Sequence, residues 1–216
     1  MRNPGETARG GGGGEDDLLS ALPDALLNHV MSFLRAWEVA CTCVLSRRWR
    51  HLWATAPCVD LRLWGGRGHL RPPARLAKFA YRFLLEREVS AAVDTLRVMS
   101  SPVSFSDYEE GEEPSPQVVD YSACDVETWI RAAIKRRARV IHLTGHPEDS
   151  DFPDLNHVPI ISRHLKHLKI TGFSLEDRTL RQISCHCPCL EILELKCCLL
   201  DGREISSTSL KSLTMV

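Results

Sequence analysis

Cysteine and histidine side chains gather near the C-terminal end of the chain at a spacing that could bind a metal. The run CHCPC occupies positions 185–189, and Cys197 and Cys198 follow it. Thiolate and imidazole are preferred zinc ligands, but the run lacks the C-x-x-C pairing of familiar structural zinc sites. Thiols can also serve as small buried side chains beside a strand. Both interpretations are open; we favour structural thiols without metal, and we expect Cys187, Cys189 and Cys197 to be buried.

Two basic clusters could contact nucleic acid. They are the run RRWRH at 47–51, in which Trp49 could stack on a base, and the run KRRAR at 135–139. The formal net charge of the whole chain is −1, so acidic residues cancel these clusters overall. A charged outer face of an amphipathic helix is the commoner origin of such runs, and we favour it. A nucleic-acid-binding regulator is a minor alternative, which a steep salt dependence of binding would support.

Catalytic sequence patterns are absent. No glycine-rich phosphate loop is followed by a helix and a lysine, and no G-x-S-x-G elbow occurs. The glycines at 10–14 precede no strand, and the His and Asp residues of 146–154 are typical of a solvated turn. We therefore expect no catalytic residues and no cofactor, and the chain must act by binding.

The elements best suited to binding lie in residues 18–53, whose pattern predicts three short amphipathic helices. The apolar face of the first helix comprises Leu27, Val30, Met31 and Leu34, at i, i+3, i+4 and i+7. A second helix is expected at roughly 38–44, and a third after Ser46 as N-cap, with Trp49 and Trp53 one turn apart. So small a unit cannot bury all of its apolar side chains alone, so we expect it to bind a partner.

The residue pattern of this segment resembles a known motif. Leu-Pro-Asp at 22–24, Leu-Leu at 26–27, Ser-Phe-Leu at 32–34 and VLSRRWRHLW at 44–53 resemble the F-box of plant F-box/leucine-rich-repeat proteins of the FBD-associated type. In that family the F-box binds the Skp-type adaptor of a cullin-based ubiquitin ligase, and the resemblance implies the same here. The residues expected to contact the adaptor are Leu22, Pro23, Leu26, Leu45, Trp49 and Trp53. For Trp37, an exposed contact and a packing role are equally open.

Further helices and strands are predicted beyond the helical segment. Helical periodicity covers 74–88 and 126–137, and a short strand fits 93–98. The inward side chains of the second of these helices are expected to be Trp129, Ile130 and Ala133. Residues 104–117 are acidic and rich in Ser, Gly and Pro, which predicts a mobile surface insertion.

A repeated pattern organises the rest of the chain. L-x-x-L-x-L or a close variant begins at Leu165, Leu190 and Leu210, at intervals of 25 and 20 residues, and weaker copies begin at Ala138 and Val93. These intervals match leucine-rich repeats, which stack short parallel strands and bury a leucine ladder. The returning segment of one repeat should close the core with Leu175, Leu180 and Ile183. The side chains expected on or near the concave face are Lys166, His167, Lys169, Glu191 and Glu194.

Together these patterns predict an α/β chain. Residues 1–16 form a disordered tail, 17–57 a three-helix F-box, and 58–216 a short leucine-rich-repeat-like solenoid of parallel strands and helices. The chain ends just after Met215, on an expected core-facing strand without a polar cap, which predicts a truncated array. No run of about 18 apolar residues and no signal sequence occurs, and nine cysteines are typical of a reducing compartment, so we expect the cytoplasm, the nucleus or both.

The resemblance and the repeats imply one function and one rival. We expect the substrate-recognition subunit of an SCF-type ubiquitin ligase, in which the F-box binds the adaptor and, through it, a cullin, and the repeats bind a target protein. It would catalyse nothing itself and would bind neither nucleic acid nor membrane. The rival is a truncated scaffold or competitor that binds the adaptor without delivering a target.

Overall fold

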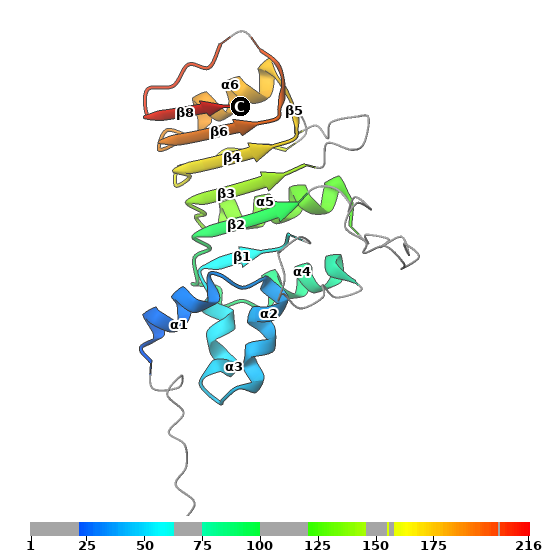
Figure 1. Ribbon diagram of the computed structural model, residues 1–216, viewed down its shortest axis with the longest axis vertical. Helices are drawn as coiled ribbons and strands as arrows, with labels where there is room; N and C mark the ends of the chain where they lie inside the picture. Colours follow the sequence, from blue (N-terminus) through cyan, green and yellow to red (C-terminus); the bar gives the residue numbers. More distant parts are fainter. Residues whose placement is uncertain (1–21, 63–74, 100–120, 146–154, 156–157, 203) are drawn as a thin grey trace, which may run out of the picture.

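The computed structural model describes residues 22–62, 75–99, 121–145, 155, 158–202 and 204–216. Among them, a group of short helices lies at one end of a layered structure of strands and helices (Figure 1). This is the expected mixed α/β architecture. The predicted tail at 1–16 and the predicted acidic insertion at 104–117 lie outside the described residues.

The N-terminal helices follow the predicted order with shifted ends. They are α1 (Asp24–Met31), α2 (Ala36–Cys41), the 3-10 turn η1 (Thr42–Val44), α3 (Trp49–Leu52) and the 3-10 turn η2 (Trp53–Thr55). The carbonyl of Pro23 accepts hydrogen bonds from the N–H groups of Leu26 and Leu27, so Pro23 stands just before α1. Helix α3 begins after Arg48, two residues later than expected, so the prediction of Ser46 as its N-cap is wrong.

Six parallel strands form the main sheet, in the order β1-β2-β3-β4-β6-β8. They are β1 (Cys58–Asp60), β2 (Thr95–Met99), β3 (Val140–Thr144), β4 (His167–Thr171), β6 (Ile192–Lys196) and β8 (Ser212–Met215). The pairing places Leu96, Ile141 and Leu168 side by side, followed by Leu193 and Leu213. The same position of each repeat therefore meets in one row, which confirms the predicted register. Strand β1, and a second sheet of β5 (Ser174–Glu176) and β7 (Leu199–Asp201), were not predicted.

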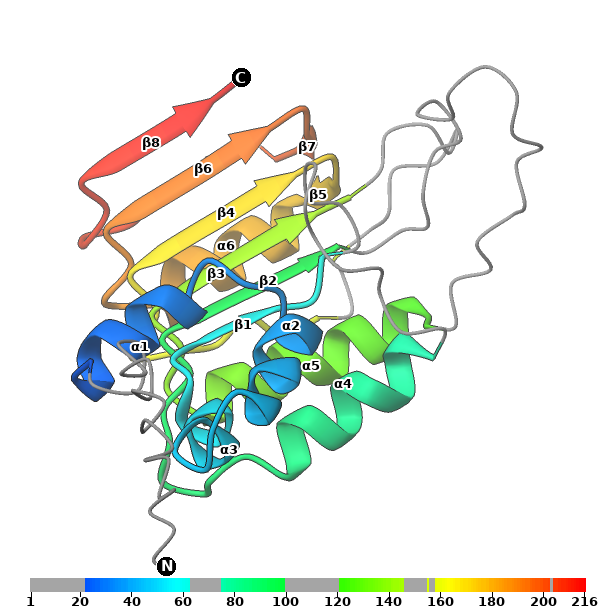
Figure 2. The ribbon, with the colours of Figure 1, turned by 60° about the horizontal axis from the view of Figure 1, so that its bottom comes forward.

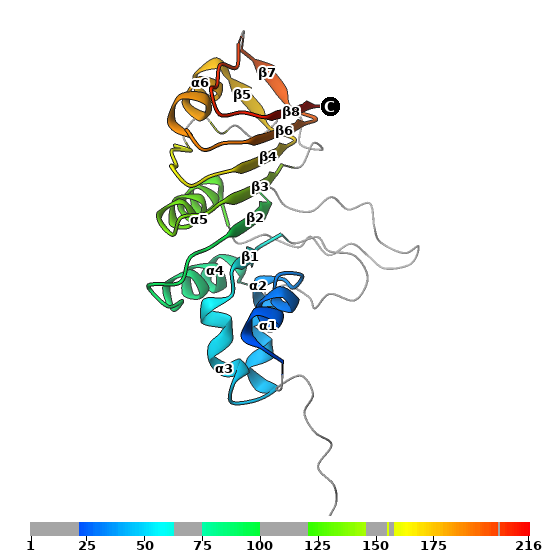
Figure 3. The ribbon, with the colours of Figure 1, turned by 90° about the vertical axis from the view of Figure 1, so that its left-hand side faces the viewer.

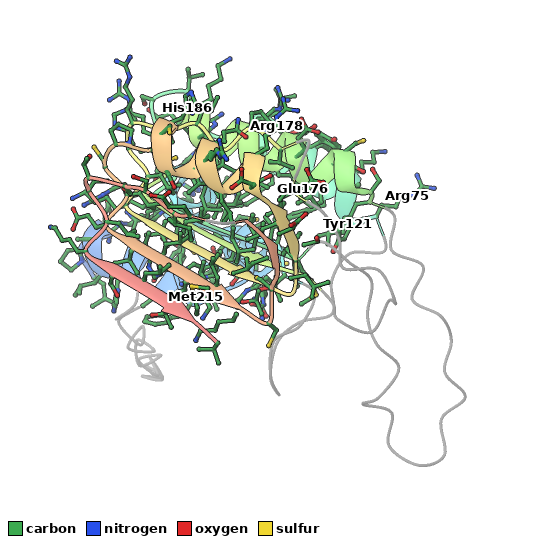
Figure 4. All side chains as sticks on the ribbon, turned by 90° about the horizontal axis from the view of Figure 1, so that it is seen from above. Arg75, Tyr121, Glu176, Arg178, His186 and Met215 are labelled. Atoms are coloured by element: carbon green, nitrogen blue, oxygen red, sulfur yellow. The ribbon has the colours of Figure 1, made fainter. Side chains whose placement is uncertain are left out.

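Three helices cover one face of the main sheet: α4 (Leu76–Leu85), α5 (Ala123–Lys135) and α6 (Asp177–His186) (Figures 2 and 3). Viewed from above, α6 with Arg178 and His186 lies on one side of the sheet, and Met215 marks the last strand β8 (Figure 4). The side chains predicted to face inward are buried: Trp129, Ile130 and Ala133 of α5, and Leu175, Leu180 and Ile183 of the returning segment. We call the opposite face the outward face; among the described residues, helices approach it at its β1 end, where Arg35 at the start of α2 contacts Asp60.

One hydrophobic core joins the helical module to the sheet. It runs from Leu27 and Met31 of α1 through Val59 of β1 to the leucines of β6. At the junction the buried Arg87 donates hydrogen bonds to the carbonyls of Ala56, at 2.5 Å, and Trp53, at 3.5 Å. Burial and the nearby Arg136 lower the pKa of Arg87 to about 10, so the guanidinium stays charged at neutral pH. The two parts are therefore packed as one body.

Successive repeats also approach closely at their turns. Gly172 has φ +72°, and a Cβ added there would lie 2.9 Å from the carbonyl oxygen of Gly145 in the preceding repeat. The N–H of Gly172 donates to the carbonyl of Lys196 in the next repeat, at 2.9 Å. Only glycine can adopt this left-handed backbone conformation without strain and also fit so close to the neighbouring repeat.

Candidate functional site

Helix α1 turns an apolar face to solvent. Leu26, Val30 and Phe33 lie at i, i+4 and i+7, and Leu26 and Phe33 are 50% and 67% exposed. Leu27 and Met31, on the other side, are fully buried. The single apolar face predicted from Leu27, Val30, Met31 and Leu34 is therefore divided between the interior and solvent.

A second exposed apolar segment lies where η1 leads to α3. Val44 is 82% exposed and Leu45 is also exposed. Arg48, just beyond them, donates from Nε to Oδ1 of Asp24 at 3.0 Å and forms an ion pair with it. This contact holds the turn beside the start of α1. We call Leu26, Val30, Phe33, Val44 and Leu45 together the apolar patch.

The residues predicted to contact the adaptor fall into two groups. Pro23, Leu26 and Leu45 are exposed, and Leu22 is half-buried against the core. Trp49 is only 3% exposed, and Trp53 is half-buried with its ring 5.4 Å from that of Phe83. The two indoles thus support the fold of the module from inside.

Sequence reasoning missed three members of the apolar patch: Val30, Phe33 and Val44. Phe33 and Val44 belong to segments that matched the family motif, so the match itself could have pointed to them. Trp37 of α2 is buried, which settles it as a packing residue.

A buried ionic cluster links the helical module to β1. Asp60 accepts a hydrogen bond from Nη1 of Arg35 at 2.7 Å, and it also contacts Arg62 at 2.7 Å and Arg97 at 3.5 Å. Burial alone would raise the pKa of Asp60, but the hydrogen bond and charge of Arg62, together with Arg35, outweigh it and lower the pKa. Asp60 is therefore ionised at neutral pH.

Polar side chains form a row across the outward face. Strand pairing aligns Asp60, Arg97, His142, Lys169 and Glu194 on five neighbouring strands. Alternation along β3 and β4 buries the intervening aliphatic side chains on the helix side. The expected positions of Lys169 and Glu194 on this face are confirmed.

His167 lies beside that row, and Nε2 of its ring is 2.9 Å from Oε1 of Glu194. Lys166 and Glu191 precede their strands and pair at 3.3 Å on the rim of the sheet. These predicted positions are confirmed as well. The row and the rim give the outward face a regular set of charges.

The cysteines divide between the interior and the surface. Cys187 is buried, and its Sγ lies 3.4 Å from the carbonyl oxygen of Ile160. Cys189 and Cys197 are exposed, so the expectation that they are buried was wrong. Each lies in a turn beside a strand, where the side chain points away from the core. No group of three His, Cys, Asp or Glu side chains in the described ranges is arranged to hold a metal ion.

None of the helices that the structure describes combines the length and apolar character needed to cross a membrane. What the described residues offer chemically is two surfaces for binding, the apolar patch and the charged outward face.

Comparison with known proteins assigns the helical module. The F-box domain family matches residues 19–59, close to the predicted 17–57. The chain is 28% identical over 241 residues to "Putative F-box/LRR-repeat protein At3g59160" of Arabidopsis thaliana, a match that covers 93% of this chain and 51% of the relative. It is 26% identical to "Putative F-box/LRR-repeat protein At3g28410" of the same plant, over 83% of this chain and 37% of the relative.

A further relative is "Putative FBD-associated F-box protein At5g56440" of Arabidopsis thaliana, 31% identical over 59% of this chain and 25% of the relative. The chain thus spans between a quarter and about half of the length of these relatives. No solved structure matches it significantly. The chain therefore carries an F-box domain followed by a leucine-rich-repeat-like sheet, and it is homologous over most of its length to plant F-box/LRR-repeat proteins.

Proposed function

We propose that the chain is the substrate-recognition subunit of an SCF-type ubiquitin ligase. F-box/LRR proteins typically act as non-catalytic adaptors, and F-box domains generally bind Skp-type adaptors. The F-box here binds the Skp-type adaptor and thereby a cullin, and the repeats bind a target protein. Holding a target near a ubiquitin-charged enzyme makes the transfer effectively intramolecular, which accelerates it without a catalytic residue in this chain.

The observation that carries the proposal is the apolar patch. Its members, Leu26, Val30, Phe33, Val44 and Leu45, are exposed although the neighbouring core is complete without them. Burying one such side chain in a partner stabilises a complex by about 1.5 to 3 kcal/mol. Five side chains on two adjacent segments can therefore supply the anchors of an interface.

The shared core supports the second half of the proposal. Arg87 and the continuous apolar cluster fix the F-box to the sheet, so a target bound to the repeats stands at a set distance from the adaptor. A flexible linker between the two parts would spread the target over many positions and lower its effective concentration. A fixed geometry suits a subunit that presents one protein to another.

The test is capture of a purified Skp-type adaptor by the full chain. Leu26→Glu and Leu45→Glu place a charge in the proposed interface and should each abolish capture, because a carboxylate cannot be buried there without a partner. The matched control is Leu85→Glu on α4, since Leu85 is 81% exposed and lies outside the apolar patch. Full capture by both patch variants, or equal loss in the control, contradicts the proposal.

Two further measurements define the role. Ubiquitination of captured proteins with adaptor and cullin present supports a recognition subunit, whereas capture without ubiquitination indicates the scaffold or competitor. A fluorescent fusion tests the proposed cytoplasmic or nuclear location.

A further inference from the structure

We propose that the outward face binds an extended segment of a target protein that carries carboxylates at about every third residue, through Arg97 and Lys169 of the row and Lys196 beside it. The proposal rests on the proposed function, because it names the chemistry by which the repeats recognise their target.

The first support is a surplus of cations around Asp60. Arg35, Arg62 and Arg97 all contact this one carboxylate. Glu38 lies nearby and accepts a hydrogen bond from the backbone N–H of Arg35, at 2.7 Å. Three guanidinium groups and two carboxylates therefore lie together at the end of the face nearest the F-box, which gives this cluster a formal charge of +1.

The same imbalance recurs at Glu194, four strands away from Asp60 in the sheet. The ammonium groups of Lys169 and Lys196 each lie 3.6 Å from Oε2 of Glu194, and His167 contacts Oε1. Burial is the largest single influence and would raise the pKa of Glu194, but the hydrogen bond from His167 and the charges of Lys169 and Lys196 together outweigh it and lower the pKa. One ionised carboxylate is therefore paired with two ammonium groups.

The rim of the sheet repeats the pattern. Glu191 lies between Lys211, at 2.9 Å, and Lys166, at 3.3 Å. Arg139 and Asp94, the equivalent rim positions of the two preceding repeats, balance each other in charge. The described residues named here on the outward face and its rim thus sum to a net positive charge, on a chain whose formal net charge is −1.

His142 lies at the centre of the row, in register between Arg97 and Lys169. Burial and the neighbouring His167, Arg97 and Lys169 lower the pKa of His142 to about 4. The imidazole is therefore neutral at pH 7. The neutral ring lies between the cations Arg97 and Lys169, which are therefore two distinct charged positions. An anion bound over them would favour the protonated imidazole and raise the pKa of His142.

The spacing selects the ligand. Arg97 and Lys169 are two strands apart, about 10 Å at the usual strand separation, which an extended peptide covers in about three residues. Charges spread over several strands fit several separate carboxylates better than one compact anion. The face also holds carboxylates of its own, and the row across it contains no tryptophan, tyrosine or phenylalanine on which a base could stack, which is unlike a nucleic-acid surface.

The experiment uses the full chain in complex with its adaptor and a fluorescent 12-residue peptide with glutamate at every third position. Fluorescence anisotropy should show binding that weakens as salt rises, and no binding of the twin peptide with glutamine at those positions. Lys169→Gln should weaken binding by about two- to fivefold, the usual effect of one exposed charge. Lys135→Gln, on the outer face of α5, is the matched control and should change nothing. NMR titration of His142 should show its pKa rising from about 4 when the acidic peptide is bound.

Each alternative result overturns the proposal. These results are equal binding of the glutamine peptide, equal weakening by Lys135→Gln, an unchanged pKa of His142, or tighter binding of an RNA oligonucleotide of equal charge. Adaptor capture is measured on the same samples, so failure of the proposed function shows as loss of capture, independently of the peptide result.

Discussion

Replacing Trp49 by alanine should destabilise the F-box before it affects any contact with the adaptor. The indole is 3% exposed and belongs to the core that contains Leu27 and Met31. A buried indole hides about 200 Å², which at about 25 cal/mol per Å² amounts to about 5 kcal/mol. Measured Trp→Ala changes in cores cost about 3 to 5 kcal/mol, a large share of the 5 to 15 kcal/mol that holds a domain folded.

Urea unfolding followed by circular dichroism measures this cost directly. With a slope of about 2 to 3 kcal/mol per molar urea, the midpoint should fall by about 1 to 2 M. Leu45→Ala should instead weaken adaptor binding and leave the stability almost unchanged. Its midpoint should move little because the side chain is exposed, while adaptor affinity falls by about 2 kcal/mol, roughly thirtyfold. An unchanged midpoint for Trp49→Ala together with lost capture would show that the indole contacts the adaptor directly, and would refute this reasoning.

Three other outcomes are expected. Asp60→Asn should lower the free energy of unfolding by about 3 to 5 kcal/mol at pH 7, because it removes the partner of buried guanidinium groups. The pKa of Asp60 in the folded protein lies below its value in the unfolded chain, so this stabilisation is complete above about pH 4 and is lost as the pH falls through the folded pKa. The difference in unfolding free energy between Asp60→Asn and the unchanged protein should therefore shrink at pH 3. A difference that stays constant with pH would contradict this prediction. Gly172→Ala should cost more than about 1 kcal/mol in thermal unfolding, because the new Cβ would meet Gly145, and an unchanged melting temperature would argue against that contact. In thiol labelling of the native chain, Cys189 should react at once and Cys187 only on unfolding, since burial raises the pKa of the Cys187 thiol; equal rates would contradict its burial.

The repeated strands could be predicted from sequence because their signal is long and periodic. The pattern beginning at Leu165 and Leu190 fixed the facing of β4 and β6, and the same pattern placed Lys169 and Glu194 on the outward face. Strand β1 was missed because Cys58–Asp60 is too short to show alternation, and all three of its residues are buried.

Other features depended on neighbours that local sequence does not reveal. Leu26 and Leu27 are chemically identical, yet one is exposed and the other buried, because only Leu27 faces the core. The same holds for Cys187 and Cys189, which are two residues apart with opposite burial. The resemblance to a known motif identified the helical module, but it could not tell which motif residues face a partner and which face inward.

The alternation along β3 and β4 has a consequence for how such a protein can change over generations. Ile141, Leu143, Leu168 and Ile170 are buried and hold the fold, whereas His142 and Lys169, one residue away, are partly exposed on the outward face. A single codon change at an exposed outward position such as Lys169 can therefore alter which ligand is held without loosening the interior. Alternate residues of the same strand thus determine ligand preference and stability, so selection can change the ligand preference while the stability stays constant.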